Sequence, residues 1–194
     1  MAALLGSGVK KMKSLIVVDC QYDFIDGSLA CENAENAVSE IIQYLNENEI
    51  KAYYSKDWHS RENKSFKVNG GIWPVHCVQG ERGASLHEDF YRLVDQDENK
   101  PNEGNTYYKG MDDQVEEYSA YKAKNDQNVT LKDSLQGEVI VAGIASEFCV
   151  RETVLALLKD GHRVGILKEG LGYVDSEEHR KNLEDLKDRG ARII

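Results

Sequence analysis

The 194-residue sequence lacks the features that mark several classes of protein. Its four cysteines form no CxxC pair and follow no secretory signal peptide, so we expect a reducing compartment, the cytoplasm, and no disulfide framework. Lysine and arginine (24) are outnumbered by aspartate and glutamate (34), and the net charge of −10 argues against a nucleic-acid surface. The apolar run near the amino terminus, AALL, is far too short to span a membrane. We therefore expect partners other than nucleic acids and membranes.

Proline is scarce as well, with 2 residues, and no repeat or low-complexity segment is present. A hydrophobic content of 41% in a chain of this length suits one domain with a sizeable core. We expect this domain to occupy residues 14–194. Residues 1–13 are interpreted as a disordered leader, either native or left over from cloning. The sequence leaves the oligomeric state open, a homo-oligomer included.

Short apolar runs alternate with amphipathic segments along the chain. We expect strands at residues 14–19, 51–56, 106–108, 139–142, 163–167 and 191–194, and helices at 33–48, 84–93, 147–159 and 177–189. This alternation predicts an α/β fold, a three-layer α/β/α sandwich around a mostly parallel sheet of about six strands. In such sheets ligands bind beyond the carboxyl ends of the strands. The loop at residues 60–82 is long for a compact domain, and such loops are usually functional.

One stretch, EVIVAGIASEFCVRETVLAL at residues 138–157, predicts a buried strand, a small-residue turn and a helix. Its Cys149 belongs to the first residues of the helix, where the helix dipole and unpaired N–H groups favour a thiolate and can hold an oxyanion. An inert buried cysteine is the alternative, since free cysteine is among the most buried residue types. The turn alone does not decide between these two interpretations.

Two charged residues also follow predicted strands, as Cys149 does. Asp19 ends the first strand and Lys109 follows the third. A carboxylate can take the proton of a cysteine, and an ammonium can stabilise the charged pair that results. Taken singly, Asp19 could be a turn or helix cap and Lys109 a solvated lysine. The three residues are therefore a hypothesis that depends on their shared location.

A second group of residues lies in and before the long loop. In an extended segment residues i and i+2 face the same side, so Asp57 and His59 converge, and His76 in WPVHC can supply a third ligand. Three protein ligands leave open positions on a metal ion, and mixed nitrogen and oxygen ligands suit Zn, Fe or Mn. The alternative is that both histidines are ordinary loop residues. Three aromatic residues can likewise be either core residues or walls of an aromatic substrate pocket: Phe24, Trp73 and Tyr118.

These segments contain a series of motifs: LIVVDCQYDF, SKDWHSRENKSF, GGIWPVHCVQG followed by GASLH, YYKG, EEYSAY and VAGIASEFCVRETVLALLKDG. Each motif is moderately specific alone, but their order and spacing are strongly specific. By these motifs the chain resembles the nicotinamidases (pyrazinamidases) of the isochorismatase-like cysteine hydrolases over almost all of residues 14–194. The resemblance implies the fold of that family and a cytoplasmic enzyme of NAD salvage. Such an enzyme hydrolyses nicotinamide to nicotinate and ammonia, and pyrazinamide to pyrazinoate.

The resemblance also implies roles for the residues at the strand ends. Asp19, Lys109 and Cys149 correspond to the catalytic triad of the family, with a thioester on Cys149 as the intermediate. The oxyanion hole corresponds to the backbone N–H groups of Ala145 and Cys149. A cis peptide bond between Ile144 and Ala145 accompanies that arrangement. The aromatic residues that pack on the pyridine ring correspond to Phe24, Trp73 and Tyr118.

The metal site is where the chain departs from many relatives. Asp57, His59 and His76 correspond to ligands of one divalent ion, for which Zn is the first expectation and Fe or Mn the others. Many relatives carry another histidine four residues after His59, and this chain has Asn63 there. Ser65 or water is then expected to complete the coordination shell.

Two other functions stay open. Another isochorismatase-like amidase or hydrolase could share the aspartate, lysine and cysteine, although the DWH and WPVHC motifs count against an isochorismatase. A catalytically silent binding protein could share the fold, although the complete set of triad and metal residues counts against it.

Overall fold

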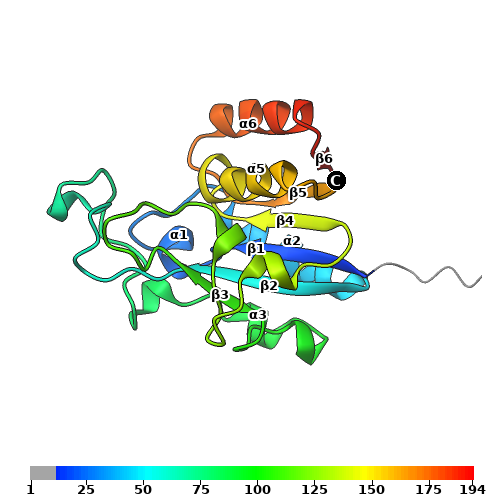
Figure 1. Ribbon diagram of the computed structural model, residues 1–194, viewed down its shortest axis with the longest axis horizontal. Coiled ribbons are helices and arrows are strands. Elements are labelled where there is room, and N and C mark those ends of the chain that lie inside the picture. Colours follow the sequence, from blue (N-terminus) through cyan, green and yellow to red (C-terminus); the bar gives the residue numbers. More distant parts are fainter. Residues whose placement is uncertain (1–11) are drawn as a thin grey trace, which may run out of the picture.

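The computed structural model describes residues 12–194, which fold around one β-sheet (Figure 1). The predicted leader lies outside the described residues as far as residue 11, and Lys13 already belongs to the first strand. The sheet has six strands in the order β3-β2-β1-β4-β5-β6, and every neighbouring pair is parallel. The strands are β1 (Lys13–Val18), β2 (Ile50–Asp57), β3 (Thr106–Lys109), β4 (Val139–Gly143), β5 (Val164–Leu171) and β6 (Arg192–Ile193).

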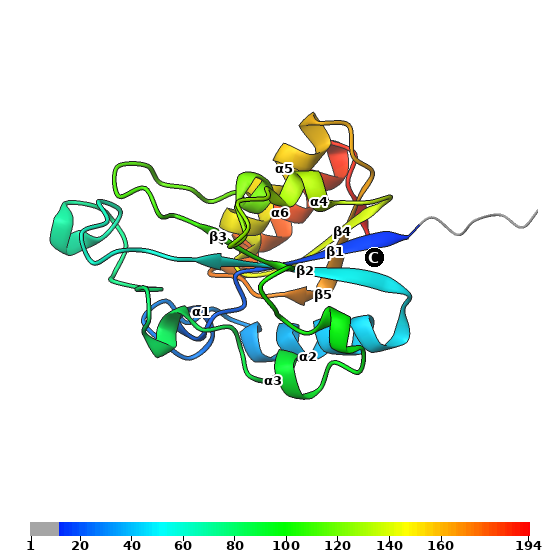
Figure 2. The same cartoon turned by 60° about the horizontal axis from the view of Figure 1, so that its bottom comes forward.

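Helices cover both faces of this sheet. In Figure 2, α1, α2 and α3 lie on one side of the sheet, and α4, α5 and α6 lie on the other. This arrangement confirms the predicted α/β/α sandwich. Within residues 12–194, no helix has the length and apolar character that a membrane crossing requires. The helices are α1 (Tyr22–Ile25), α2 (Ala34–Glu47), α3 (Asp89–Arg92), α4 (Leu131–Ser134), α5 (Arg151–Lys159) and α6 (Ser176–Asp188).

The central strand β1 is buried on both faces. Leu15 and Val17 belong to the hydrophobic core on the α2 side, and Ile16 and Val18 to the core on the α5 side. All four side chains are fully buried. A parallel strand between two helix layers needs apolar residues in both directions, which explains the continuous run LIVV. Each such side chain stabilises the fold by about 1.5 to 3 kcal/mol relative to an exposed position.

One predicted helix is wrong over most of its length. Of the predicted segment 84–93, only Asp89–Arg92 is α-helical, after a 3₁₀ turn at Arg82–Ala84. Between these two, Leu86 forms an antiparallel β-bridge with Gln21, so the chain is extended there. Leu86 and Phe90 are buried, but Tyr91 and Leu93 are about half exposed, so the segment does not bury one amphipathic helix face. The other predicted strands and helices are present with shifted ends.

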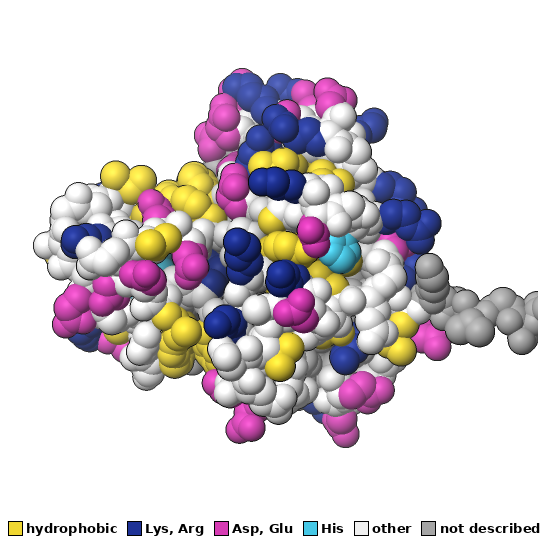
Figure 3. All heavy atoms as spheres, in the orientation of Figure 1, with side chains coloured by type: hydrophobic (Ala, Val, Ile, Leu, Met, Phe, Trp, Pro, Cys, Tyr) yellow, Lys and Arg dark blue, Asp and Glu magenta, His cyan; other side chains and the backbone are white. Residues whose placement is uncertain are grey.

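The strand order explains where a ligand can bind. Because β1 lies between β2 and β4, the loops that leave these strands diverge at their carboxyl ends and open a crevice. The residues at these ends are those to which the sequence assigns functions. The long loops beyond them form the lobe at the left of Figure 1, and in Figure 3 this lobe shows hydrophobic side chains beside acidic ones.

Candidate active site

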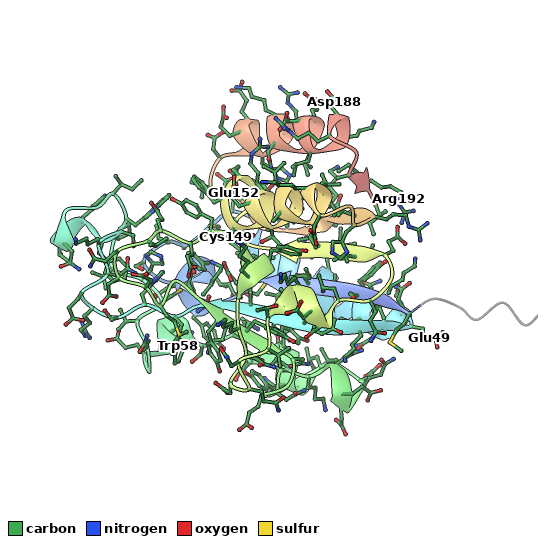
Figure 4. All side chains as sticks on the ribbon, in the orientation of Figure 1. Glu49, Trp58, Cys149, Glu152, Asp188 and Arg192 are labelled. Carbon is green, nitrogen blue, oxygen red and sulfur yellow. The ribbon has the colours of Figure 1, made fainter. Side chains whose placement is uncertain are left out.

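The turn between β4 and α5 brings Cys149 to this crevice (Figure 4). A π-helical turn, Ser146–Val150, precedes α5, so Cys149 lies in the first turn of the helical segment and is 6% exposed. The chain enters the turn through Gly143, whose φ is +120°. A Cβ at Gly143 would lie 2.1 Å from the carbonyl oxygen of Val18, so only glycine allows β4 to approach β1 this closely.

The backbone before Cys149 offers a hydrogen-bond donor without a partner. The Ile144–Ala145 peptide bond is cis, as the resemblance implied. Within residues 12–194 the Ala145 N–H donates to no acceptor, although Ala145 is only 8% exposed. Buried N–H groups without a partner are rare in folded proteins. Together with the Cys149 amide in the first helical turn, this donor can hold an oxyanion beside the thiol.

Asp19, Lys109 and Cys149, here called the triad, lie in direct contact. Lys109 Nζ is 2.8 Å from Asp19 Oδ2 and 3.5 Å from Cys149 Sγ. Asp19 Oδ1 accepts a hydrogen bond from Ser55 Oγ at 2.6 Å. Asp19 Oδ2 forms an ion pair with Lys109, and the Asp19 carboxyl also interacts with the Cys149 thiol. The carboxyl of Asp19 is therefore placed to exchange a proton with the thiol.

Burial controls the ionisation of the triad. It raises the pKa of Asp19, and the neighbouring Lys109 only partly opposes this. It would lower the pKa of Lys109, but Asp19 and Asp57 raise that pKa well above its usual value. It raises the pKa of Cys149 well above its usual value, against the opposing effect of Lys109. A thiolate was expected at the helix N-terminus, but burial opposes it. The desolvation of Cys149 raises its pKa by more than the positive charge of Lys109 lowers it.

Asp57, His59 and His76, here called the ligand cluster, also converge. Their potential ligand atoms all lie within 4.8 Å of one another. The carbonyl oxygens of Gly110 and Pro74 lie 2.8 Å from His59 Nδ1 and His76 Nδ1 respectively. A carbonyl oxygen only accepts, so each Nδ1 carries the proton and each Nε2 keeps its lone pair in the neutral ring. Both histidines are therefore oriented as metal ligands usually are.

The ionisation of the ligand cluster differs from residue to residue. Burial alone would raise the pKa of Asp57, but Lys109 and His59 hold it below its usual range. Burial lowers the pKa of His76, which favours the neutral, ligating ring. Burial would also lower the pKa of His59, but the hydrogen bond and charge of Asp57 raise it. A permanent carboxylate beside two imidazoles is a donor set for Zn, Fe or Mn.

Two nearby side chains test whether a divalent ion fits this cluster. The Oδ1 atom of Asn63 accepts a hydrogen bond from the Ser65 amide at 2.9 Å, so that oxygen is already engaged. The Ser65 hydroxyl oxygen, in contrast, is buried and has no hydrogen-bond partner within residues 12–194. Both residues line the same pocket as the ligand cluster. An unpartnered buried oxygen beside the Nε2 atoms of two imidazoles and a carboxylate fits a divalent cation.

The pocket above these groups has aromatic walls. The three predicted aromatic residues all line it, and so do Cys149 and the ligand cluster. The Phe24 ring centroid is 5.5 Å from that of His76, and the Trp73 and Phe148 rings meet edge to face at 5.3 Å. The Tyr118 ring lies 6.0 Å from Phe148. A flat aromatic ligand therefore finds apolar walls with reactive groups at their base.

Two residues in the site were missed at the sequence level. Gln21 is fully buried, and its side-chain amide bonds both the N–H and the carbonyl of Asp57, at 2.8 Å each. Glu116 lines the pocket and bonds two of its aromatic walls. Gln21 follows Asp19 by two residues and Glu116 lies within EEYSAY, so both belong to recognised motifs. Polar residues in loops carry no pattern that reveals their hydrogen-bond partners.

Comparisons with known proteins show the family of the chain. The family profile of the Isochorismatase domain matches residues 13–194. The nicotinamidase of Escherichia coli (strain K12) is 28% identical over 182 residues, which cover 81% of this chain and 82% of that protein. The nicotinamidase of Saccharomyces cerevisiae is 28% identical and covers 94% of this chain and 99% of that protein.

Two solved structures extend the likeness to three dimensions. The pyrazinamidase of Pyrococcus horikoshii in complex with zinc superposes with a TM-score of 0.78 at 30% identity, over 94% of this chain and 98% of that chain. PnC1 from L. infantum in complex with nicotinate superposes with a TM-score of 0.80 at 31% identity, over 94% of this chain and 92% of that chain. The similarity therefore extends over the sheet, both helix layers and the loops that form the pocket.

Proposed function

The chain belongs to the isochorismatase family, and from this premise we propose that it is a metal-dependent cysteine amidohydrolase that converts nicotinamide to nicotinate and ammonia. Pyrazinamide, which has the same carboxamide on a similar ring, would be converted to pyrazinoate. The enzyme would act in NAD salvage in the cytoplasm. A related amidase with another substrate is the alternative.

One observation carries the proposal. The triad and the ligand cluster share Lys109, whose ammonium contacts both Asp19 and Asp57. Cys149 and the ligand cluster line one pocket with aromatic walls, and Lys109 contacts Asp19, Asp57 and Cys149. A planar heteroaromatic carboxamide matches this combination, because the walls accept its ring and the thiol at the base faces its carboxamide carbon.

The first half of the reaction follows from the triad. Asp19 Oδ2 takes the proton of Cys149, and Lys109 stabilises the charges that form. A raised pKa makes Asp19 a stronger base than an ordinary carboxylate, which suits a thiol whose own pKa is raised. The sulfur attacks the carboxamide carbon as the proton leaves. The oxyanion that forms accepts hydrogen bonds from the Ala145 and Cys149 amides, each worth about 3 to 4 kcal/mol in comparable enzymes.

The second half returns the enzyme to its starting state. Asp19 gives its proton to the departing nitrogen, so ammonia leaves and an acyl thioester remains on Cys149. Water then attacks the thioester with Asp19 again as the base. The carboxylic acid leaves, and Asp19 passes the proton back to the sulfur.

Asp57, His59 and His76 would hold the divalent ion, with Ser65 Oγ as a further oxygen ligand. When bound, such an ion supplies a Lewis acid that can hold the pyridine nitrogen directly or through water. Gln21 holds the Asp57 backbone through its N–H and its carbonyl. Together with the aromatic walls of the pocket, this would keep the substrate ring aligned with the thiol.

Ammonia release by the wild-type protein and by Cys149→Ala tests the nucleophile. We expect release from nicotinamide by the wild type and a loss of roughly 10³-fold or more in the variant. Cys31→Ala is the matched control, because Cys31 lines the same pocket but its thiol donates to the Leu29 carbonyl and not to the triad. Substantial release by Cys149→Ala would reject the assignment.

A panel of nicotinamide, pyrazinamide and an acyclic amide tests the substrate class. We expect both ring carboxamides to be hydrolysed, because the aromatic walls contribute binding free energy only to a ring. Activity on the acyclic amide alone would favour a related amidase.

A further inference from the structure

The mouth of the pocket carries a carboxylate that the proposed reaction does not use. Glu116 lines the pocket and its side chain is exposed. It accepts hydrogen bonds from Trp73 Nε1, at 2.6 Å, and from the Tyr118 hydroxyl. Trp73 belongs to the loop after β2 and Tyr118 to the segment after β3, so Glu116 connects two walls of the pocket. Two donors from separate segments hold this carboxylate in one position.

No cation neutralises this group within the part of the chain that the structure describes. Glu116 forms no ion pair with any lysine, arginine or histidine among residues 12–194. Both of its partners are neutral donors. Its hydrogen bonds therefore fix the position of a negative charge without cancelling that charge.

The proposed substrate and product differ mainly in charge. Both carry the same ring, but the carboxamide is neutral and the carboxylic acid is an anion at neutral pH. A fixed negative charge on the pocket wall raises the free energy of a bound anion and leaves a neutral ligand almost unaffected. We propose that Glu116 is a specificity-determining residue whose charge favours the neutral carboxamide over its carboxylate product, and so promotes product release. This inference rests on the proposed function.

Glu116→Gln tests the charge because glutamine keeps an oxygen acceptor and nearly the same shape. The measured quantities are the KM for nicotinamide and the inhibition constant for nicotinate. Glu152→Gln is the matched control, since it makes the same charge change on α5 near Cys149 (Figure 4) at an exposed residue that does not line the pocket. Each variant is assayed at low ionic strength and near 1 M salt, where the screening length falls to about 3 Å.

We expect Glu116→Gln to bind nicotinate about 3- to 10-fold more tightly at low salt, with a KM for nicotinamide within about two-fold of the wild type. The difference should shrink at high salt, and Glu152→Gln should behave like the wild type. An unchanged inhibition constant would overturn the inference. Equal shifts of the KM and the inhibition constant would also overturn it, because they would indicate that the pocket walls had changed. An equal effect of Glu152→Gln would overturn it as well, because it would indicate a response to the net charge of the protein.

The outcome for Glu116 can be separated from the outcome for the proposed function. Hydrolysis of nicotinamide with no effect of Glu116→Gln rejects the inference alone. Absence of hydrolysis by the wild type rejects the proposed function. In that case calorimetric dissociation constants for nicotinamide and nicotinate test Glu116 directly. The inference is rejected if the ratio of the two constants is the same in the wild type and in Glu116→Gln, or if neither ligand binds.

Discussion

The triad and the ligand cluster are the two halves of the site, and they belong to different kinds of backbone. The triad is attached to the ends of β1 and β3 and to the turn after β4, and the hydrogen bonds of the sheet set its spacing. Two members of the ligand cluster, His59 and His76, stand instead on the loop after β2. An isolated bridge between His59 and Val78 and ring contacts hold that loop. Strand ends thus carry the proposed reacting groups, and a loop carries two of the three proposed metal ligands.

The two halves also differ in the ionisation of the carboxylates that contact Lys109, which are Asp19 and Asp57. Asp19 has a raised pKa because burial dominates, which suits a group that must gain and lose a proton. Asp57 has a lowered pKa because both Lys109 and His59 outweigh its burial, which suits a permanent anion. One ammonium therefore contacts both the proposed base and a proposed metal ligand, and substitutions should separate the two functions.

Asp19→Asn should have the largest effect and should leave the metal in place. An amide cannot take the thiol proton, so we expect kcat to fall by about 10³-fold. Steady-state assays and elemental analysis on the same preparation measure the two quantities. Asp26→Asn, which alters an exposed partner of Arg82, should keep full activity. If Asp19→Asn keeps activity within tenfold of the wild type, Asp19 is not the base.

His76→Ala should have the opposite outcome, with the metal lost and the triad intact. Removing one of the two proposed histidine ligands should weaken metal binding by about 100-fold or more. Elemental analysis after dialysis measures this loss. His87→Ala is the control, because His87 lies outside the cluster. A full metal content in His76→Ala would show that His76 is not a metal ligand.

Gly110→Ala should damage the ligand cluster through the backbone. Gly110 has a φ of +69°, and a Cβ there would lie 2.3 Å from His59 Cε1. We expect the free energy of unfolding to fall by roughly 2 to 4 kcal/mol, together with metal binding. Gly161→Ala, at a φ of +81° with open space around its Cβ, should cost only about 1 kcal/mol. Denaturant unfolding measures both variants. An equal loss of unfolding free energy in the two would mean that the positive φ, and not the contact with His59, causes the effect at Gly110.

The pH dependence of Cys149 alkylation tests the ionisation of the triad. A raised pKa means that the thiol is protonated at neutral pH and becomes a thiolate only as the pH rises towards that pKa. Without substrate, the labelling rate of Cys149 should therefore keep rising into the alkaline range, by up to about tenfold per pH unit. Peptide mass spectrometry measures the rate. A plateau near neutral pH would show that the helix N-terminus and Lys109 outweigh burial.

Ser65→Ala should have the smallest effect. It removes the buried hydroxyl without a partner, so metal affinity should fall by about 3- to 10-fold. The metal-free protein should be slightly more stable, by about 1 kcal/mol, because an unsatisfied polar group is lost. Competition with a chelator and thermal unfolding measure the two effects, and Ser60→Ala is the control. An unchanged affinity would leave water as the fourth ligand.

The strand-based half of the site was accessible from the sequence alone. The apolar runs before Asp19 and Cys149 predict buried strands, and parallel strands bring their carboxyl ends together. The fold and the position of the crevice follow from this pattern. The helix that was wrongly predicted at 84–93 shows the limit, because a β-bridge between Leu86 and Gln21 keeps the chain extended there, and local periodicity does not contain this contact between distant segments.

The loop-based half was accessible only in part, because the spacing of Asp57 and His59 indicates that they converge but leaves His76 a candidate among loop residues. No periodic pattern relates His59 to His76, and the bonds that orient their rings come from backbone carbonyls. The raised pKa of Cys149 was not predictable either, since it depends on how completely distant segments bury the thiol. Glu116 shows the same limit, because its partners, Trp73 and Tyr118, lie on two segments that only the fold brings together.

The most direct test of the central proposal is the mass of the intact protein during turnover. Wild-type protein mixed with nicotinamide and quenched in acid should show a fraction that has gained one nicotinoyl group, mapped by peptide mass spectrometry to Cys149. The same peptide from Cys149→Ala should stay unmodified. Hydrolysis of nicotinamide with no acyl group on Cys149 at any quench time, or with the group on another residue, would contradict the proposed mechanism.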